Sequence, residues 1–204
     1  MANQAAGEGI MNLLGAAMVA GAYLLGSIPF GLLITRLMGG PDPRHGGSGN
    51  IGATNVTRLA GRAAGVATLF LDAAKGAVPM ALALAYLPPW PAAAVGLAAF
   101  LGHLYPLYLG FKGGKGVATA LGVLATASPL TFLATLGVLV LAAWWSGHVS
   151  VGSMAGCASA PIWLMIWGQS PPLTFMALAM ALMVIWRHRA NIVRLRQGSE
   201  HGWR

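Results

Sequence analysis

The stretch "VATALGVLATASPLTFLATLGVLVLAAWWSG", residues 117–147, determines how many membrane helices the sequence predicts. It is apolar throughout and is longer than the roughly 20 residues that one transmembrane helix requires. Pro129, within "ASPL", interrupts it, and proline breaks or kinks a helix because it has no backbone N–H group. The stretch is therefore either one long helix or a short helix over 117–127 followed by a second helix over 130–147.

Composition places the chain among integral membrane proteins. Of its 204 residues, 57% are hydrophobic and 8% are charged, whereas an average soluble domain has about 25% charged residues. The net charge of +8 indicates membrane topology and anionic partners rather than nucleic acid in such a chain. Cys157 is the only cysteine, so a disulfide framework and a cysteine-rich metal site are excluded. We expect residues 1–204 to form a single membrane-embedded domain.

Charge placement indicates how the stretch is divided. Other apolar runs lie at about 10–35, 63–87, 92–109, 149–168 and 173–187, and all twelve basic residues lie at 36–75, 112–115 and 187–204. A single helix over 117–147 would put the basic C-terminal segment on the opposite side from the other basic segments, against the positive-inside rule. A break at Pro129 puts all of them on one side. We therefore predict an all-α integral membrane protein with seven transmembrane helices, the N-terminus outside, the C-terminus cytoplasmic and a short fourth helix, 117–127.

This topology brings four polar segments to the predicted cytoplasmic face, namely 36–62, 110–116, 148–153 and 187–197. Polar backbone at membrane depth is tolerated only where protein buries it or where it lines a wet cavity. The convergence therefore predicts a site at that face.

The first polar segment contains "RHGGSGNIGATNVTR" (44–58), which offers many groups to an oxyanion. Its literal G-x-G-x-x-G pattern is not a dinucleotide fingerprint, because that motif needs a βαβ unit. Its glycines still permit close backbone approach, and its hydroxyl, amide and guanidinium groups suit a phosphate. The alternative is a flexible polar loop. The candidate residues are Gly47, Ser48, Gly49, Asn50, Gly52, Thr54, Asn55 and Arg58, with Arg44 beside them.

The stretch "GFKGGKGVAT" (110–119) cannot be a Walker A loop, since G-x-x-x-x-G-K-[ST] does not fit it. We expect Gly113, Gly114 and Gly116, with Lys115, to form a backbone nest for a phosphate at the N-terminus of the 117–127 helix. The alternative is that Lys112 and Lys115 are ordinary anchors at the membrane surface.

Asp72 and Lys75, in "FLDAAKGAVP" (70–79), are three residues apart within an apolar span and are therefore able to pair. Charges at that depth are costly and are candidates for function. We favour a structural ion pair over a direct catalytic part, because each group satisfies the other.

Further polar residues lie at predicted cytoplasmic helix ends. His103, Ser150 and Ser153 are candidates, although a lone histidine there is more often a structural donor than a base. His188 and Asn191 are three residues apart and share one helical face. The alternative for this tail is headgroup anchoring by its arginines, Arg187, Arg189 and Arg194.

The motifs that are missing narrow the reaction class. The carboxylates Glu8, Asp42, Asp72 and Glu200 are scattered and offer no pair for acid/base hydrolysis. The sequence has no H-E-x-x-H motif, no H-x-x-x-x-D acyltransferase motif and no G-x-S-x-G elbow. We expect no metal and no cofactor. The remaining glycine, hydroxyl, amide and cationic groups are of the kind that binds phosphates.

These residues resemble a known family, the acyl-phosphate-dependent glycerol-3-phosphate acyltransferases of bacteria, or PlsY family. The resemblance covers nearly the whole chain and is specific through the combination and order of its motifs. They are "GSIPFG" (26–31), "GSGNIGATNV" (47–56), "LDAAKG" (71–76), "GHLYPLYLGFKGGKGVAT" (102–119) and "RHRANIVRL" (187–195). The family consists of small seven-helix membrane enzymes with a cytoplasmic active site.

The resemblance implies an enzyme that transfers a fatty acyl group from acyl phosphate to the 1-hydroxyl of glycerol 3-phosphate, giving lysophosphatidic acid and phosphate. This reaction is the first step of bacterial phospholipid synthesis. The implied location is the bacterial inner membrane, with membrane lipid around the protein, no nucleic acid and no obligate protein partner. A transporter of a phosphorylated metabolite is the alternative, and a lipid-binding scaffold is a third reading.

The resemblance also implies roles for particular residues. Taken together with the glycines and Asn50 of the two polar stretches discussed above, it gives as catalytic residues Ser48, Arg58, Lys115, His188 and Asn191, and as substrate-binding residues Gly47, Gly49, Asn50, Gly52, Thr54, Asn55, Gly113, Gly114, Gly116 and Ser153. The first polar segment would handle the acyl-phosphate headgroup. Lys115, Ser153, His188 and Asn191 would hold glycerol 3-phosphate and orient its hydroxyl.

Overall fold

The computed structural model describes residues 2–202, which form helices, turns and loops and contain no strand. The elements are α1 (Ala2–Gly26), α2 (Phe30–Leu37), α3 (Ala53–Tyr86), α4 (Pro89–Leu104), the 3₁₀ turn η1 (Leu107–Leu109), α5 (Val117–Ala127), α6 (Pro129–Ser146), α7 (Val149–Ile166), α8 (Pro171–Arg187) and α9 (Arg189–Arg196). The expectation of an all-helical protein is confirmed over this range.

Several helices have the length and composition to cross a membrane. Five segments qualify among the described residues, namely Gly9–Leu37, Ala53–Tyr86, Pro89–Leu109, Pro129–Ser146 and Val149–Ile166. A sixth is formed when α8 and α9, which are bent by 51° relative to each other, are taken together. The protein is therefore a multi-pass membrane protein. The count of seven spans and their orientation stay predictions.

The helix break that the sequence predicts at Pro129 is present. α5 ends at Ala127, and Ser128 caps α6, its side-chain oxygen accepting a hydrogen bond from the Thr131 N–H group. α5 has 11 residues and is about 16 Å long at 1.5 Å per residue. That length is roughly half of a 30 Å hydrocarbon core.

Two other helix boundaries differ from those expected from the apolar runs. The run at 10–35 is divided, because α1 ends at Gly26 and Pro29 precedes α2. α3 begins at Ala53 instead of near residue 63, and it contains a break at Gly61, whose φ of 87° and ψ of 172° suit glycine alone. Thr54, Asn55 and Arg58 therefore belong to a short helical segment before this break, so the alternative of a flexible polar loop is wrong for them.

Neighbouring helices pack closely through small residues, as is usual in membranes. α5 lies against α3 at Gly122, where an added Cβ would be 2.0 Å from the Ala73 carbonyl oxygen. α7 lies against α6 at Gly152, where an added Cβ would be 2.3 Å from the Leu139 carbonyl oxygen. The helices α4, α5, α7 and α8 surround the largest core cluster, which includes Phe100.

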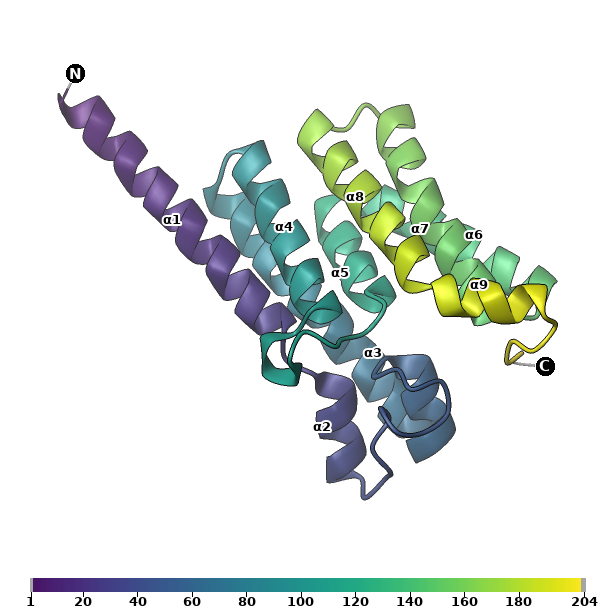
Figure 1. Cartoon of the computed structure of the whole chain (residues 1–204). Helices are drawn as coiled ribbons and strands as arrows, with labels where there is room; N and C mark the ends of the chain where they lie inside the picture. Colours follow the sequence, from purple (N-terminus) through teal and green to yellow (C-terminus); the bar gives the residue numbers. More distant parts are fainter. Residues whose placement is uncertain (1, 203–204) are drawn as a thin grey trace.

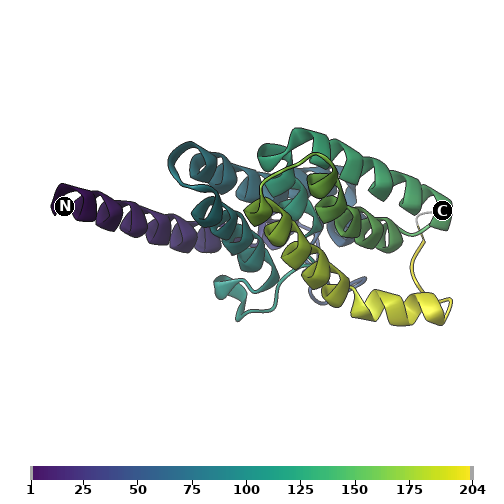
Figure 2. The ribbon, with the colours of Figure 1, turned by 90° about the horizontal axis from the view of Figure 1, so that it is seen from above.

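The polar segments collect at one end of the bundle. Figure 1 shows the 38–52 loop, the 105–116 segment and α9 at the end opposite to the start of α1. In Figure 2, α1 projects away from the other helices, and the C-terminal segment lies on the far side of the molecule. The fold thus gathers residues that are distant in sequence at one end.

Candidate active site

A cavity of about 670 Å³ lies at this end of the bundle, a size typical of small-molecule sites. It is bordered by the first polar segment, by α3, α5, α6, α7 and α9, and by the C-terminal tail. The polar and charged residues of its lining are Ser48, Asn50, Thr54, Asn55, Thr57, Arg58, Asp72, His103, Lys115, Ser150, Ser153, His188, Asn191, Arg194, Glu200 and His201.

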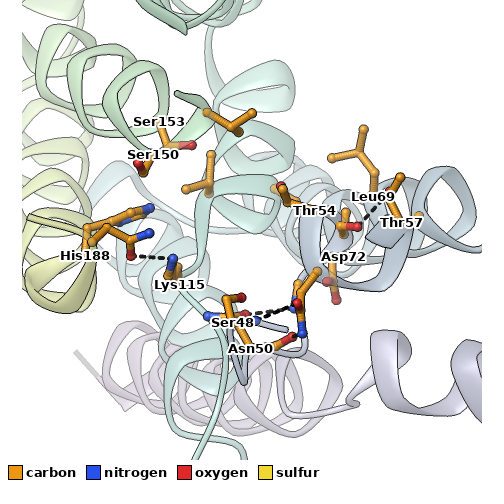
Figure 3. A pocket seen from close by; sticks show the side chains of 18 of the residues that line it. Ser48, Asn50, Thr54, Thr57, Leu69, Asp72, Lys115, Ser150, Ser153 and His188 are labelled. Atoms are coloured by element: carbon orange, nitrogen blue, oxygen red, sulfur yellow. Dashed lines mark hydrogen bonds between the residues drawn. The ribbon is translucent and has the colours of Figure 1, made fainter. Parts of the chain in front are cut away.

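The cavity has a polar part and an apolar part. The apolar lining comes from Val66, Leu69, Val117, Leu121, Leu136, Leu139 and Val149. Val66 and Leu69 are about half exposed, so this part borders the surface that lipid would cover. Figure 3 shows Lys115 and His188 on one side of the cavity, Thr54 and Thr57 on the other, and Ser48 between them. A molecule with an anionic head and an apolar tail fits such a lining.

Lys115 is held in the cavity by the last helix. Its Nζ donates a hydrogen bond to Asn191 Oδ1 at 2.6 Å. Burial lowers the pKa of Lys115 to about 8, the Glu200 carboxylate opposes this shift, and Arg194 and Arg58 add to it. The ammonium is therefore a partly desolvated cation, which strengthens its attraction for an anion.

The glycines before Lys115 shape the loop and do not line the cavity. The Gly113 and Gly114 N–H groups donate to the Leu104 and His103 carbonyl oxygens at 3.2 and 3.0 Å. The Arg187 guanidinium donates to the carbonyl oxygens of the same two glycines. Their N–H groups are thus already used inside the protein. Of the predicted nest, Lys115 and Gly116 line the cavity, with Val117 and Ala118 of the α5 N-terminus beside them.

Asn55 organises the first polar segment. Its Oδ1 accepts a hydrogen bond from the Ser48 N–H group at 2.9 Å, and its Nδ2 donates to carbonyl oxygens of Pro43, Gly46 and Asn50. Asn55 is 2% exposed. Its amide therefore holds the loop in shape and leaves the Ser48 hydroxyl and Arg58 facing the cavity.

Two glycines of this segment have backbone conformations that favour glycine over other residues. Gly47 and Gly49 have φ values of 57° and 69°, in the left-handed region that favours glycine. An added Cβ at Gly47 would lie 2.3 Å from Asn55 Oδ1. Neither glycine lines the cavity, whereas Gly52 does. Arg44 is also directed elsewhere, since it forms a bidentate pair with Asp42.

His188 presents one ring nitrogen to the site. Its Nδ1 lies 2.8 Å from the Val184 carbonyl oxygen, which can only accept a hydrogen bond. Nδ1 therefore carries the proton in the neutral ring, and the lone pair is on Nε2. His188 is 2% exposed and lines the cavity. This tautomer allows Nε2 to accept a hydrogen bond or a proton.

Asp72 and Lys75 form a buried ion pair beside the cavity, with Lys75 Nζ 2.8 Å from Asp72 Oδ1. Lys75 also donates to the Ile28 carbonyl oxygen at 2.9 Å. His103 Nδ1 lies 3.6 Å from the same carboxylate oxygen. The pair thus ties α3 to α4 and to the chain between α1 and α2. Asp72 and His103 line the cavity, and Lys75 does not.

Sequence reasoning missed Glu200, which has no motif around it. Glu200 Oε1 accepts hydrogen bonds from Ser150 Oγ at 2.9 Å and from Asn191 Nδ2, and Oε2 accepts one from Arg194 Nε at 2.7 Å. Burial would raise the pKa of Glu200, but these hydrogen bonds outweigh it and lower the pKa. The carboxylate is therefore a fixed anion within a cationic site. Ser153, which the sequence did predict, also lines the cavity.

The fold and this amphipathic cavity fit the class of integral membrane enzymes that act on phosphorylated lipids. A family profile described as glycerol-3-phosphate acyltransferase matches residues 16–198. Proteins named glycerol-3-phosphate acyltransferase from Syntrophotalea carbinolica and Geobacter sulfurreducens are each 50% identical over 186 residues, covering 90% of this chain and 95% of the relative. The chain belongs to the glycerol-3-phosphate acyltransferase family.

Two solved structures are similar to the chain along most of its length. Both are crystal structures of PlsY (YgiH), an integral membrane glycerol 3-phosphate acyltransferase, one in a glycerol 3-phosphate form and one in a lysophosphatidic acid form. Their TM-scores are 0.90 and 0.88 at 44% identity, and the matches cover 93% of this chain and 96% and 95% of the others. The resemblance to the PlsY family noted from the sequence is thus confirmed.

Proposed function

We propose that the chain transfers a fatty acyl group from acyl phosphate to the 1-hydroxyl of glycerol 3-phosphate, at the cytoplasmic face of a bacterial inner membrane. The acyltransferase activity and the acceptor follow from the family and from the two solved relatives. The donor, the membrane and the face are our proposals. The observation that carries the donor is one cavity that joins a cationic, hydroxyl-rich part to an apolar part.

The two parts of the cavity suit the two substrates. Lys115, Asn191, His188 and Ser153 form a polar group that suits the phosphate and hydroxyls of glycerol 3-phosphate. Ser48, Thr54 and Arg58, on the other side, suit the phosphate of an acyl phosphate. The leucines of α3, α5 and α6 then provide an apolar wall for its acyl chain.

The reaction needs positioning more than covalent catalysis, because acyl phosphate is an activated mixed anhydride. The glycerol 1-hydroxyl oxygen attacks the acyl carbonyl carbon, and the bond from that carbon to the phosphate oxygen breaks. Inorganic phosphate leaves with the bonding electrons. The hydroxyl proton passes either to His188 Nε2 or to an oxygen of the leaving phosphate. Arg58 and Lys115 stabilise the negative charge that develops.

The other readings of the sequence are not favoured. A transporter of a phosphorylated metabolite and a lipid-binding scaffold both lack support from the comparisons, which join this chain to acyltransferases along 90% of its length. Much of the polar lining of the cavity comes from the loops, α9 and the tail, whereas transporters typically bind at a midplane site between repeated halves.

Purified protein in detergent should convert acyl phosphate and glycerol 3-phosphate into lysophosphatidic acid and phosphate in equal amounts. Acyl-CoA, supplied in place of acyl phosphate, should give no product. The matched control is Arg58→Ala, which removes one cavity cation. Product formation from acyl-CoA alone would contradict the proposed donor, and phosphate release without lysolipid would contradict acyl transfer.

A further inference from the structure

Glu200 connects the C-terminal tail to two helices of the site. Its carboxylate accepts hydrogen bonds from Ser150 at the start of α7 and from Asn191 and Arg194 on α9. Its side chain is 7% exposed, although it lies outside every helix. A tail carboxylate buried on three donors has a defined position, because displacing it would leave those donors without partners.

The Asn191 amide lies between Glu200 and Lys115. Its Nδ2 donates to Glu200 Oε1, and its Oδ1 accepts from Lys115 Nζ at 2.6 Å. A carboxylate only accepts hydrogen bonds, and an ammonium only donates them. Only one orientation of the amide therefore satisfies both neighbours, with its oxygen toward the lysine.

The balance of charge around the cavity also depends on Glu200. Lys115, Arg58 and Arg194 all line it, and Glu200 is a nearby counter-charge. Asp72, the other described carboxylate in the lining, is engaged by Lys75 at 2.8 Å. Removing the negative charge at position 200 would leave Arg194 unpaired and the Asn191 amide free to turn.

We propose that Glu200 is a positioning residue that holds the Asn191 amide oxygen toward Lys115 and so keeps the Lys115 ammonium at the glycerol 3-phosphate site. This inference rests on the proposed function for the identity of the acceptor. Glu200 does not itself occupy the place of a substrate anion beside Lys115, since its oxygens accept hydrogen bonds from Ser150, Asn191 and Arg194 while the Lys115 ammonium bonds to Asn191.

The test compares Glu200→Gln with Gln197→Ala, a change at an exposed residue of the same tail. Glu200→Gln should raise the KM for glycerol 3-phosphate about tenfold, the lower end expected for a charge-assisted bond, with a smaller change in kcat. The alkaline limb of kcat/KM should move to lower pH, because Lys115 loses an attracting charge. Gln197→Ala should match the wild type in both.

A double-mutant cycle with Asn191→Ala tests the route of the effect. If Glu200 acts through Asn191, Glu200→Gln should change the KM little in the Asn191→Ala background, a failure of additivity. Equal effects in both backgrounds would overturn the proposal. A lower KM in Glu200→Gln would also overturn it, because that result is expected if Glu200 competes with the substrate anion. Loss of active protein with an unchanged KM and pH profile would overturn it as well, because a purely structural role predicts that result.

Calorimetric binding of glycerol 3-phosphate, without any acyl donor, separates this inference from the proposed reaction. Weaker binding by Glu200→Gln than by the wild type and Gln197→Ala supports the positioning role even if acyl phosphate is not the donor. Equal binding by all three overturns it. An inactive wild type that still binds glycerol 3-phosphate contradicts the proposed donor alone.

Discussion

The ammonium of Lys115 lies 2.6 Å from the amide oxygen of Asn191, which is 76 positions further along the chain. One residue belongs to the loop after α4, and the other belongs to the bent last helix. The contact closes the cavity on one side and places a cation beside His188 (Figure 3). The geometry of this side of the cavity therefore depends on both the loop before α5 and the last helix.

Lys115 and Lys112 should differ strongly although both are basic residues of one loop. Lys115 lines the cavity, whereas Lys112 is exposed and does not line it. Lys115→Ala should lower kcat/KM for glycerol 3-phosphate by roughly 10- to 150-fold, the loss expected for a charge-assisted hydrogen bond. Lys112→Ala should stay near the wild type. Similar kinetics for both variants would mean that the two lysines serve only as membrane anchors.

The activity should fall at alkaline pH. Lys115 has a pKa lowered to about 8, so it is charged below that pH and loses its charge as the pH rises through it. A phosphate monoester, whose second pKa is about 6, stays dianionic in this range. The plot of kcat/KM against pH should therefore decline above about 8, since it reports on the free enzyme. Lys115→Arg, which keeps its charge, should lack this decline; an unchanged limb in that variant would assign it to another group.

Gly114→Ala should destabilise the protein through packing. An added Cβ would lie 2.0 Å from His103 Nε2, and His103 is buried beside Asp72. Overpacking of this kind costs about 1–3 kcal/mol, so the unfolding temperature in detergent should drop. Gly137→Ala is the control, because nothing lies within 4 Å of a Cβ at that position of α6. Equal unfolding temperatures for the two variants would contradict the close contact.

The predicted topology can be tested by labelling introduced cysteines. His45, Lys112 and Gln197 are exposed at the polar end, and Pro89 is exposed at the other. Single cysteines at the first three positions should react only from the cytoplasm, and one at Pro89 only from outside. The native Cys157 is buried and should stay unlabelled. Labelling at Gln197 from outside would rule out the seven-helix arrangement.

Local signals made parts of the fold predictable from the sequence. Pro129 and the hydroxyl residue before it mark the end of one helix and the cap of the next, and the break lies there. The start of α3 was not predictable from hydropathy, because its first turns carry Thr54, Asn55 and Arg58 for the cavity and so read as a loop. The left-handed Gly61 then separates these turns from the apolar helix.

The site was harder to predict where partners are distant in sequence. The Gly113 and Gly114 pattern suggested a phosphate nest, but their N–H groups bond to carbonyl oxygens of α4 and their own carbonyls bond to Arg187. Glu200 has no signal in its neighbouring residues, because its role depends on contacts with two helices. Motifs identify residue types at a site, whereas such pairings require the fold.

The shortness of α5 has a consequence for how the chain enters the bilayer during synthesis. Ser128, directly after α5, is 4% exposed, and Thr131, in the first turn of α6, is fully buried. Their side chains share a hydrogen bond of 2.9 Å. A helix of 11 residues is well below the roughly 20 residues that partition alone into the hydrocarbon. We expect the insertion machinery to release α5 and α6 together as a helical hairpin, with α5 following its longer neighbour. In membrane vesicles, a chain that ends at Ser128 and has been released from the ribosome should leave α5 accessible to protease, and one that ends at Gly147 should protect it.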